Sequence, residues 1–488
     1  MKKAGIIGLA FAMCLVGSFA VAANGTFDYD ALAALRSAVD SKPAPAAKPP
    51  AAKAAPAAKA APVADAAYDA CCQDTCAPSC CESPSCCESA SCGCGCAKCC
   101  EPWTLPQPCC MQKLGIKLGG WLEQGITFNP NSPVDRFNGP VAVNDRSNEY
   151  QMNQFWLYAT KPTNTGGCGW DWGGHIDMMY GTDWRYGIGY GLEDRINGHD
   201  DLYGMVLPQV YGEIAYNNIK IRGGRFAGLL YYEVVPSPMN FFYSHSYTMC
   251  YTEPQLVTGF MTDIQLGRNW LLQAGMTQGW YMWEDENNKK DFMGAVTWTS
   301  DDKKTSLKYA LTNGNQVNLG GNHGGNWFAY GLVFQRHISE NLKYVLQHNY
   351  GVADNVMPPV AGGGDAEWYT LNQYLEYKIS PKWAAGMRFE WMRDDEGFRV
   401  GGPGTNPDFP TLHTWKGNGY AGNFYEITVG LNWRPCKSFV VRPECRWDWY
   451  DGADSWVPQQ APTYHRLPFD DGNRSSQFTF AVDAIWTF

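Results

Sequence analysis

The sequence predicts an all-β protein, a transmembrane antiparallel β-barrel of about 16 strands that follows a disordered N-terminal extension. Three observations lead to this prediction: an export signal, period-two alternation of apolar and polar residues from Leu114 onward, and short turns that alternate with long loops. Mean hydropathy is -0.34, and no long uninterrupted apolar stretch follows Asn24, which excludes a polytopic helical membrane protein. Alternating strands dilute hydropathy, so a barrel stays compatible with this value.

The composition excludes one large class of partner. Aromatic residues make up 14% of the 488 residues, charged residues make up 18%, and the formal net charge is -10. An acidic, aromatic-rich chain lacks the basic surface on which nucleic-acid binding depends. We therefore expect no nucleic-acid partner.

The pattern of the first 70 residues predicts a targeting segment followed by a linker. Residues 1–23 join Met1-Lys2-Lys3, an apolar run and the small-residue triplet Ala20-Val21-Ala22, which is typical of a cleaved signal peptide. An uncleaved signal anchor is the alternative. Residues 24–70 contain an Ala/Pro/Lys tract that cannot build a core, and we expect an extended linker there.

A cysteine-rich segment, residues 71–110, holds 14 of the 19 cysteines. In an exported compartment oxidation is the default, so we expect disulfides to other envelope chains. The alternatives are a soft-metal cluster around Cys92-Gly93-Cys94-Gly95-Cys96 and an oxidised tail without a role. We expect neither a bound metal nor another cofactor. The disulfide candidates are adjacent pairs, namely Cys71, Cys72, Cys80, Cys81, Cys86, Cys87, Cys99, Cys100, Cys109 and Cys110.

From residue 111 to the end, the alternation predicts the barrel. In 425–434, Tyr425, Ile427 and Val429 share one face, and Glu426 and Thr428 share the other. Seven short connections interleave with eight long polar ones, as expected when short turns and long loops occupy opposite rims. We expect strands near 114–128, 149–160, 170–180, 202–215, 218–227, 257–267, 269–280, 290–300, 303–313, 326–338, 341–352, 366–379, 382–394, 423–434, 438–450 and 476–488.

The final strand and one long loop stand out. Apolar residues alternate from Phe478 to the terminal Phe488, which we interpret as an assembly signal for the barrel-assembly machinery; an ordinary edge strand is the alternative. The third long loop, residues 228–256, is too apolar and aromatic to extend into water. We expect it to fold into the lumen and narrow it, although a contact with a neighbouring subunit or lipid headgroups would also hide it.

Four motifs carry a resemblance to a known family. They are Glu233-Val234-Val235-Pro236, residues 240–247, Arg442-Pro443-Glu444-Cys445-Arg446 and Gln477-Phe478-Thr479-Phe480. With them, residues 114–488 resemble the OmpL-like β-barrel porins. The resemblance implies an outer-membrane barrel and a solute pore but supplies no substrate, and the cysteine-rich segment lies outside it.

The expected function is passive diffusion of small hydrophilic solutes through an outer-membrane barrel with a periplasmic N-terminal extension. The alternatives are a structural barrel that anchors a disulfide-linked layer and a soluble glycan-binding β-sandwich. The expected partners are outer-membrane lipid, the assembly machinery, solutes, envelope proteins linked by disulfides, and further copies of the chain. No catalytic motif is found, so we expect no enzyme; a hydrolase built on His245 with Ser244 and Ser246 is a minor alternative.

The alternation of side chains along each strand predicts which residues face the lumen. We expect basic wall positions to face acidic loop positions across the constriction. Arg225 breaks the parity of Arg222, so a bulge at Gly223-Gly224 would be needed to turn it inward. Cys436 and Cys445 would bridge if the strand register allowed it. The constriction candidates are Arg222, Arg225, Glu233, His245, Glu253, Arg388, Glu390, Arg442, Glu444 and Arg446. Further lumen candidates are Lys117, Glu123, Glu213, Lys220, Glu376 and Glu426.

Overall fold

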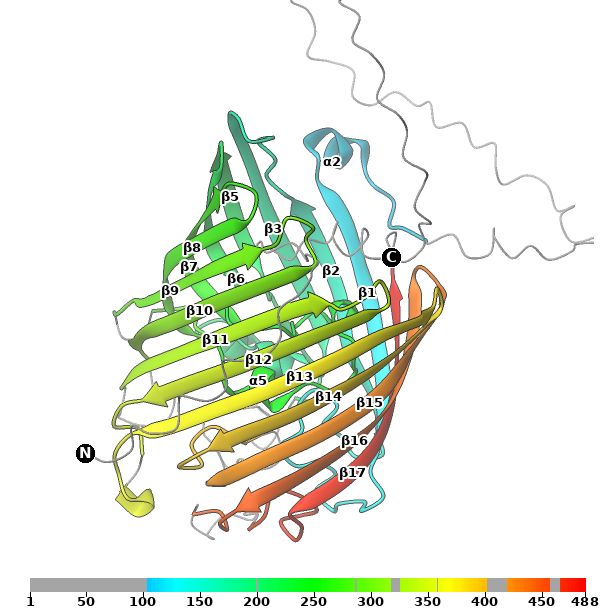
Figure 1. Cartoon of the computed structure of the whole chain (residues 1–488), viewed down its shortest axis with the longest axis vertical. Helices are drawn as coiled ribbons and strands as arrows, with labels where there is room; N and C mark the ends of the chain where they lie inside the picture. The colour runs from blue at the N-terminus through cyan, green and yellow to red at the C-terminus, as the bar shows by residue number, and fades with distance from the viewer. Residues whose placement is uncertain are drawn as a thin grey trace, which may run out of the picture. The chain divides into compact units, whose positions relative to one another are not determined.

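A computed structural model places the strands in one closed antiparallel barrel (Figure 1). The structure describes residues 103–198, 201–285, 288–316, 325–357, 359–401, 419–456 and 466–488. The expected signal peptide, the linker and the cysteines from Cys71 to Cys100 lie outside the described residues. The strands are β1 (Lys117–Phe128), β2 (Tyr150–Lys161), β3 (Trp170–Gly181), β4 (Gly204–Val206), β5 (Val210–Tyr216), β6 (Ile219–Ala227), β7 (Leu256–Leu266), β8 (Trp270–Trp280), β9 (Asp291–Thr299), β10 (Thr305–Asn315), β11 (Asn326–His337), β12 (Leu342–Ala353), β13 (Ala366–Ser380), β14 (Trp383–Asp394), β15 (Gly422–Cys436), β16 (Phe439–Gly452) and β17 (Ser476–Thr487).

These seventeen segments fill sixteen positions in the ring, which confirms the predicted strand number. β4 and β5 both pair with β3, so they are two parts of one barrel strand. The prediction of an unbroken strand over 202–215 is therefore wrong. Pro208 lies between the two parts, and a proline cannot donate to the ladder. The side chain of Gln209 turns to Asp177 instead, with a 2.9 Å hydrogen bond.

The ring closes where the two ends of the barrel domain meet. β1 pairs with β17 from Trp121 opposite Thr487 to Phe128 opposite Phe480. The backbone of Phe488 exchanges two further hydrogen bonds with Gly120, each 2.9 Å long. The terminal residue thus belongs to the ladder that seals the barrel. A sheet that closes on itself leaves no edge to aggregate.

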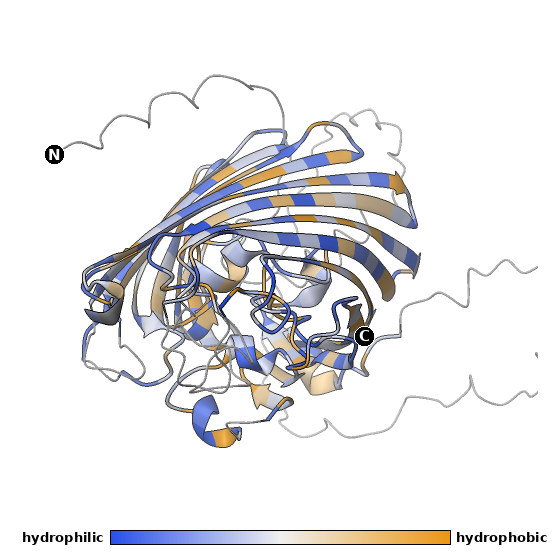
Figure 2. Cartoon of the chain, turned by 90° about the horizontal axis from the view of Figure 1, so that it is seen from below, coloured by the Kyte–Doolittle hydropathy of each residue, from blue (hydrophilic) through white to orange (hydrophobic). Residues whose placement is uncertain are grey.

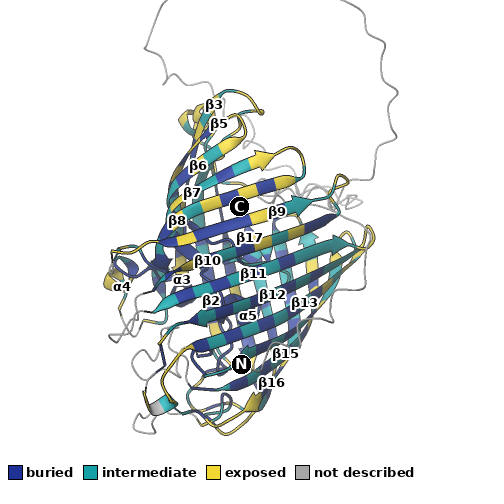
Figure 3. Cartoon of the chain, turned by 60° about the vertical axis from the view of Figure 1, so that its left-hand side comes forward, coloured by how far each residue is buried: buried dark blue, intermediate teal, exposed yellow. Residues whose placement is uncertain are grey.

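The two faces of the wall differ as the period-two pattern predicts. Outward side chains such as Trp447 and Val429 are exposed, and their inward neighbours Arg446 and Glu444 are buried. Figure 2 shows this alternation as hydropathy, and Figure 3 shows it as burial. Rows of stacked rings mark both margins of the outer face, for example Tyr350 with Tyr369 and Trp383 with Trp433. An apolar band between aromatic girdles is the lipid-facing surface of an outer-membrane barrel.

One local expectation is wrong, and the strand register decides a second. The ladder on both sides of β6 runs without a shift past Gly223-Gly224, so no bulge is present there. Gly224 instead has a φ of +134°, and an added Cβ would lie 2.2 Å from the Val210 carbonyl oxygen. Cys436 is opposite Phe439 and Cys445 is opposite Val429; both thiols are free because the register keeps them apart.

In the part of the chain that the structure describes, short helices lie in the connections and before β1. They are α2 (Cys109–Leu114), α3 (Trp184–Gly187), α4 (Glu193–Ile196) and α5 (Tyr247–Tyr251), with 3-10 turns η1 (Ser237–Met239) and η2 (Pro359–Ala361). In the described part of the chain, no helix is long and apolar enough to cross a membrane. Cys109 and Cys110 lie on α2, where both thiols are exposed and free.

Candidate functional site

The connection between β6 and β7, residues 228–255, folds into the barrel; we call it the inward loop. It contains η1 and α5, and α5 lies inside the ring of strands (Figures 1 and 3). In the sixteen-position ring, β14 is eight positions from β6 in either direction. The loop reaches β14 through Glu233, whose Oε1 is 2.8 Å from Arg388 Nη1. The inward loop therefore crosses the whole lumen.

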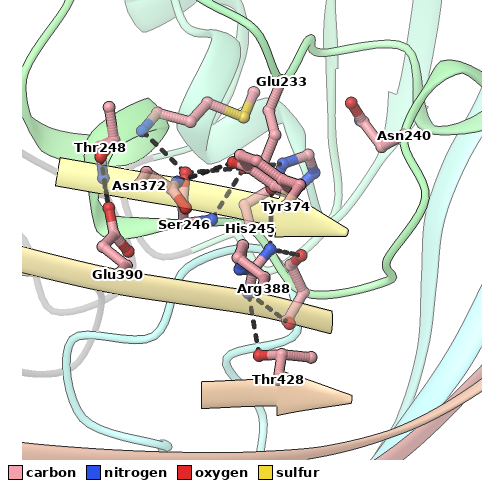
Figure 4. A network of polar contacts seen from close by, with 12 residues as sticks. Glu233, Asn240, His245, Ser246, Thr248, Asn372, Tyr374, Arg388, Glu390 and Thr428 are labelled. Atoms are coloured by element: carbon pink, nitrogen blue, oxygen red, sulfur yellow. Dashed lines mark hydrogen bonds and ion pairs between the residues drawn. The ribbon is translucent and has the colours of Figure 1, made fainter. Parts of the chain in front are cut away.

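The contact of Glu233 with Arg388 is the centre of the site (Figure 4). Arg388 also donates to the backbone oxygen of Ser244 at 2.8 Å, and its Nε bonds to Glu426 on β15. On the other side, Glu233 Oε2 accepts the backbone N–H and the hydroxyl of Ser246, both at 2.8 Å. Burial alone would raise the pKa of Glu233, but Arg388 and His245 hold this pKa well below its usual range. Glu233 is therefore an anion in the seated loop.

Two wall carboxylates bind the backbone of the inward loop. Glu390 accepts the N–H groups of Tyr247 and Thr248 at 2.7 and 2.6 Å, at the start of α5. Glu444 accepts the N–H groups of Tyr243 and Ser244 at 2.9 and 3.1 Å. The first turn of a helix has no partners of its own for these donors, so the wall supplies them.

Two wall arginines bind the carbonyl oxygens of the same loop. Arg442 donates to Ser237 O at 3.1 Å and to Asn240 O at 3.0 Å. It also pairs with Asp483 on the neighbouring strand β17 and with Glu123 on β1, the strand beyond it. Arg446 donates to His245 O at 2.6 Å. The expected basic wall is thus present, but its charges hold the loop and do not face open water.

The opposite flank of the inward loop rests on β10, β12 and β13. Lys308 donates to Tyr231 O at 2.9 Å, and Tyr232 OH lies 2.7 Å from both Lys343 Nζ and Glu376 Oε1. Glu253 Oε2 accepts from Asn349 Nδ2 at 2.7 Å. Burial raises the pKa of Glu253 to about 8.

The structure therefore brings most of the predicted residues together, with two exceptions. Glu233, His245, Glu253, Arg388, Glu390, Arg442, Glu444 and Arg446 all lie at the contact between the inward loop and the wall. Arg222 pairs instead with Asp263 on the next strand. Arg225 points out of the lumen, as its parity indicates, and lies under the 188–196 connection. It bonds to Gly187 O at 3.2 Å, and its guanidinium carbon is 5.1 Å from the ring centre of Trp283.

Sequence reasoning missed several further partners. Loop 129–148, one of the eight connections expected to be long and polar, is folded into the mouth of the barrel, with Val141, Asn144 and Asp145 buried. Arg185 binds Asp145 through two 2.8 Å hydrogen bonds. The only sequence signal was the apolar run 140–143, which the polar residues around it concealed.

The remaining chemistry of the site is limited. His245 Nδ1 is 3.5 Å from Glu233, whereas Ser244 Oγ accepts from Arg388 and Ser246 Oγ donates to Glu233. Neither serine is bonded to the histidine ring, so the arrangement that would activate a hydroxyl is not formed. Among the described residues, no group of three or more His, Cys, Asp and Glu side chains could hold a metal ion.

The fold and the polar lumen define a class of protein, the porin-like outer-membrane β-barrels. Residues 115–488 match the family model described as "Putative beta-barrel porin-2, OmpL-like", and the chain belongs to this family. No curated protein matches the chain.

Solved structures to which the chain is similar include the following three. OprB of Pseudomonas putida is 10% identical, with a TM-score of 0.49 over 78% of this chain and 95% of that one. An anion-selective porin from Comamonas acidovorans is 9% identical, with a TM-score of 0.48 over 76% and 99%. OmpF of Salmonella typhi is 10% identical, with a TM-score of 0.48 over 76% and 97%.

Proposed function

We propose that this barrel is a porin through which small hydrophilic solutes diffuse passively, and that the inward loop forms its constriction. Family membership supports the pore, and the observation that carries the constriction is the Glu233–Arg388 contact across the full width of the lumen. A lumen of sixteen strands is wide enough for an aqueous channel, and a segment held across it reduces the passage to the gaps beside the segment. Lys220, Lys343 and Glu376 remain half-buried on the side of the loop toward the short turns and are candidates to line this path.

The test is planar-bilayer recording on the purified chain, with a variant that lacks residues 236–246. We expect a small single-channel conductance for the wild type, a larger one for the variant, and entry of larger sugars in liposome-swelling assays. Equal conductance in a folded variant would contradict the role of the loop. Folding is checked by faster migration of unheated samples in detergent gels, a property of intact barrels.

A second candidate is a closed barrel that anchors a disulfide-linked layer. The observation that favours it is the burial of the wall charges: Arg388 and Glu390 have no exposed surface, and Arg446 and Glu444 keep 1% and 3%. A wild type that does not conduct, beside a loop-deleted variant that does, would support this candidate and contradict diffusion through the native barrel.

The other envelope contacts follow from the position of the chain ends. β1 begins, and β17 ends, at the rim with the short turns, which faces the periplasm in such barrels. This supports a periplasmic N-terminal extension and is compatible with the proposed role of Phe488 as an assembly signal. The exposed apolar wall supports contact with lipid or with further copies of the chain.

A further inference from the structure

Three tryptophans enclose a cation at the rim that carries the long loops. Trp280 ends β8, Trp327 lies at the start of β11 and Trp368 lies near the start of β13. The guanidinium carbon of Arg399 is 5.4, 5.2 and 5.2 Å from their ring centres. Arg399 is only 4% exposed and belongs to the connection after β14. We call these three rings the tryptophan cage.

The tryptophan cage is held by the wall and not by the arginine. Trp280 meets Trp327 edge to face at 5.2 Å, and Trp368 lies 6.0 Å from Trp327 and 6.5 Å from Trp280. The ring of Trp368 also covers Gly351 on β12, where an added Cβ would lie 2.2 Å from the ring. Because strands carry all three rings and a loop carries Arg399, removal of the arginine should leave the cage standing.

Arg399 itself is incompletely satisfied. Its Nε donates to Tyr251 O at 2.6 Å, but its Nη1 has no hydrogen-bond partner. The nearby carboxylate of Asp394 accepts the backbone N–H groups of residues 398–400 instead. Burial lowers the pKa of Arg399 to about 10. Arg399 makes no ion pair with any described carboxylate, so the aromatic faces are the main compensation for its charge.

We propose that the tryptophan cage is a binding site for small quaternary-ammonium solutes, and that Arg399 is an internal occupant which competes with them. The faces of three tryptophans attract a cation, and the unpartnered N–H groups of Arg399 and Trp280 indicate that no acceptor is in reach. A cation without N–H groups needs no acceptor, so it adds no further unsatisfied donor there.

Occupation of the tryptophan cage would also act on the inward loop. Arg399 ties its own connection to the carbonyl of Tyr251, the last residue of α5, and Tyr251 OH bonds to Pro140 O at 2.6 Å. A solute that displaces Arg399 therefore removes one of the hydrogen bonds that hold the end of α5. This consequence, unlike the binding itself, rests on the proposed constriction.

The test measures the affinity of tetramethylammonium for the purified full chain, with tryptophan fluorescence and calorimetry as the two readouts. A tethered side chain competes at an effective concentration of order millimolar or above, so Arg399→Ala should bind at least tenfold more tightly than the wild type. The double variant Arg399→Ala/Trp327→Leu should lose saturable binding while it remains a heat-modifiable barrel. No saturable binding to folded Arg399→Ala would overturn the site. Equal affinity of the wild type and Arg399→Ala would overturn the competition.

Conductance separates this inference from the proposed function. If tetramethylammonium binds as expected and neither protein conducts, the site stands and the porin function fails. If both proteins conduct and only Arg399→Ala shows larger openings, the link from the cage to α5 is supported. Equal conductance of the two proteins would overturn that link.

Discussion

Replacing Glu233 with Gln should release the inward loop without unfolding the barrel. Gln keeps an oxygen that can accept the N–H of Ser246, but it carries no charge. Glu426 is then the one carboxylate that still pairs with Arg388. Removal of one partner from a buried ion pair costs about 3–5 kcal/mol, and the lower figure applies here because Glu426 remains. Since each 1.4 kcal/mol changes an equilibrium tenfold, the seated fraction should fall roughly 100-fold relative to the released one. The barrel itself keeps its whole strand ladder.

The assay is single-channel recording, with Glu213→Gln as the matched control. Glu213 is also a buried wall carboxylate, but its partners are Lys220 and Thr163 and it does not touch the inward loop. We expect larger and longer openings for Glu233→Gln and wild-type records for Glu213→Gln. Wild-type conductance in a heat-modifiable Glu233→Gln barrel would refute the reasoning that this pair seats the loop.

Three further predictions concern pH, assembly and the cysteines. Burial in the seated loop raises the pKa of Glu253 to about 8, whereas the pKa of an unseated Glu is about 4. The contribution of Glu253 to loop seating is therefore fully present below about pH 4 and is lost as the pH rises through about 8. Conductance should increase from pH 5 to 9 in the wild type and increase less in Glu253→Gln. Phe488→Lys should reduce the heat-modifiable fraction in the outer membrane, whereas Asn341→Lys on an exposed turn should not; equal assembly would remove the terminal signal. Non-reducing gels should show high-mass species that collapse with thiol reductant and disappear when residues 71–110 are deleted, and stoichiometric metal in the purified chain would favour a cluster instead.

Strand parity predicted the wall almost completely, because a period of two ties each side chain to one face. It placed Glu123, Arg388 and Glu444 inward, and it placed Arg225 outward, where the structure has it. The error at Arg225 came from the assumption that an arginine must reach water, whereas the connection over β6 supplies Gly187 and Glu193. The break at Pro208 was readable from the sequence and was overlooked.

The partners of the inward loop could not be predicted in the same way. Tyr243 and Glu444 are 201 residues apart, and no periodicity relates the position of a loop residue to the height of a wall residue. Aromatic content showed that the loop hides from water, but it did not show where. The tryptophan cage could not be predicted for the same reason. Its members come from four separate segments, namely Trp280, Trp327, Trp368 and Arg399.

The charges of the wall have a physical reason beyond solute selection. A loop that is not part of a β-sheet has a backbone N–H and C=O at each residue that no neighbouring strand pairs. Inside a barrel these groups must find other partners, or their hydrogen bonds are lost at a cost in free energy. The wall strands have used their own backbone groups, so only side chains remain: carboxylates for the N–H groups and arginines for the carbonyls. An apolar wall would leave the same groups unpaired. Charged wall positions therefore specify one bound position for the inward loop. Because water can replace each of these hydrogen bonds, the loop can also be released from this position.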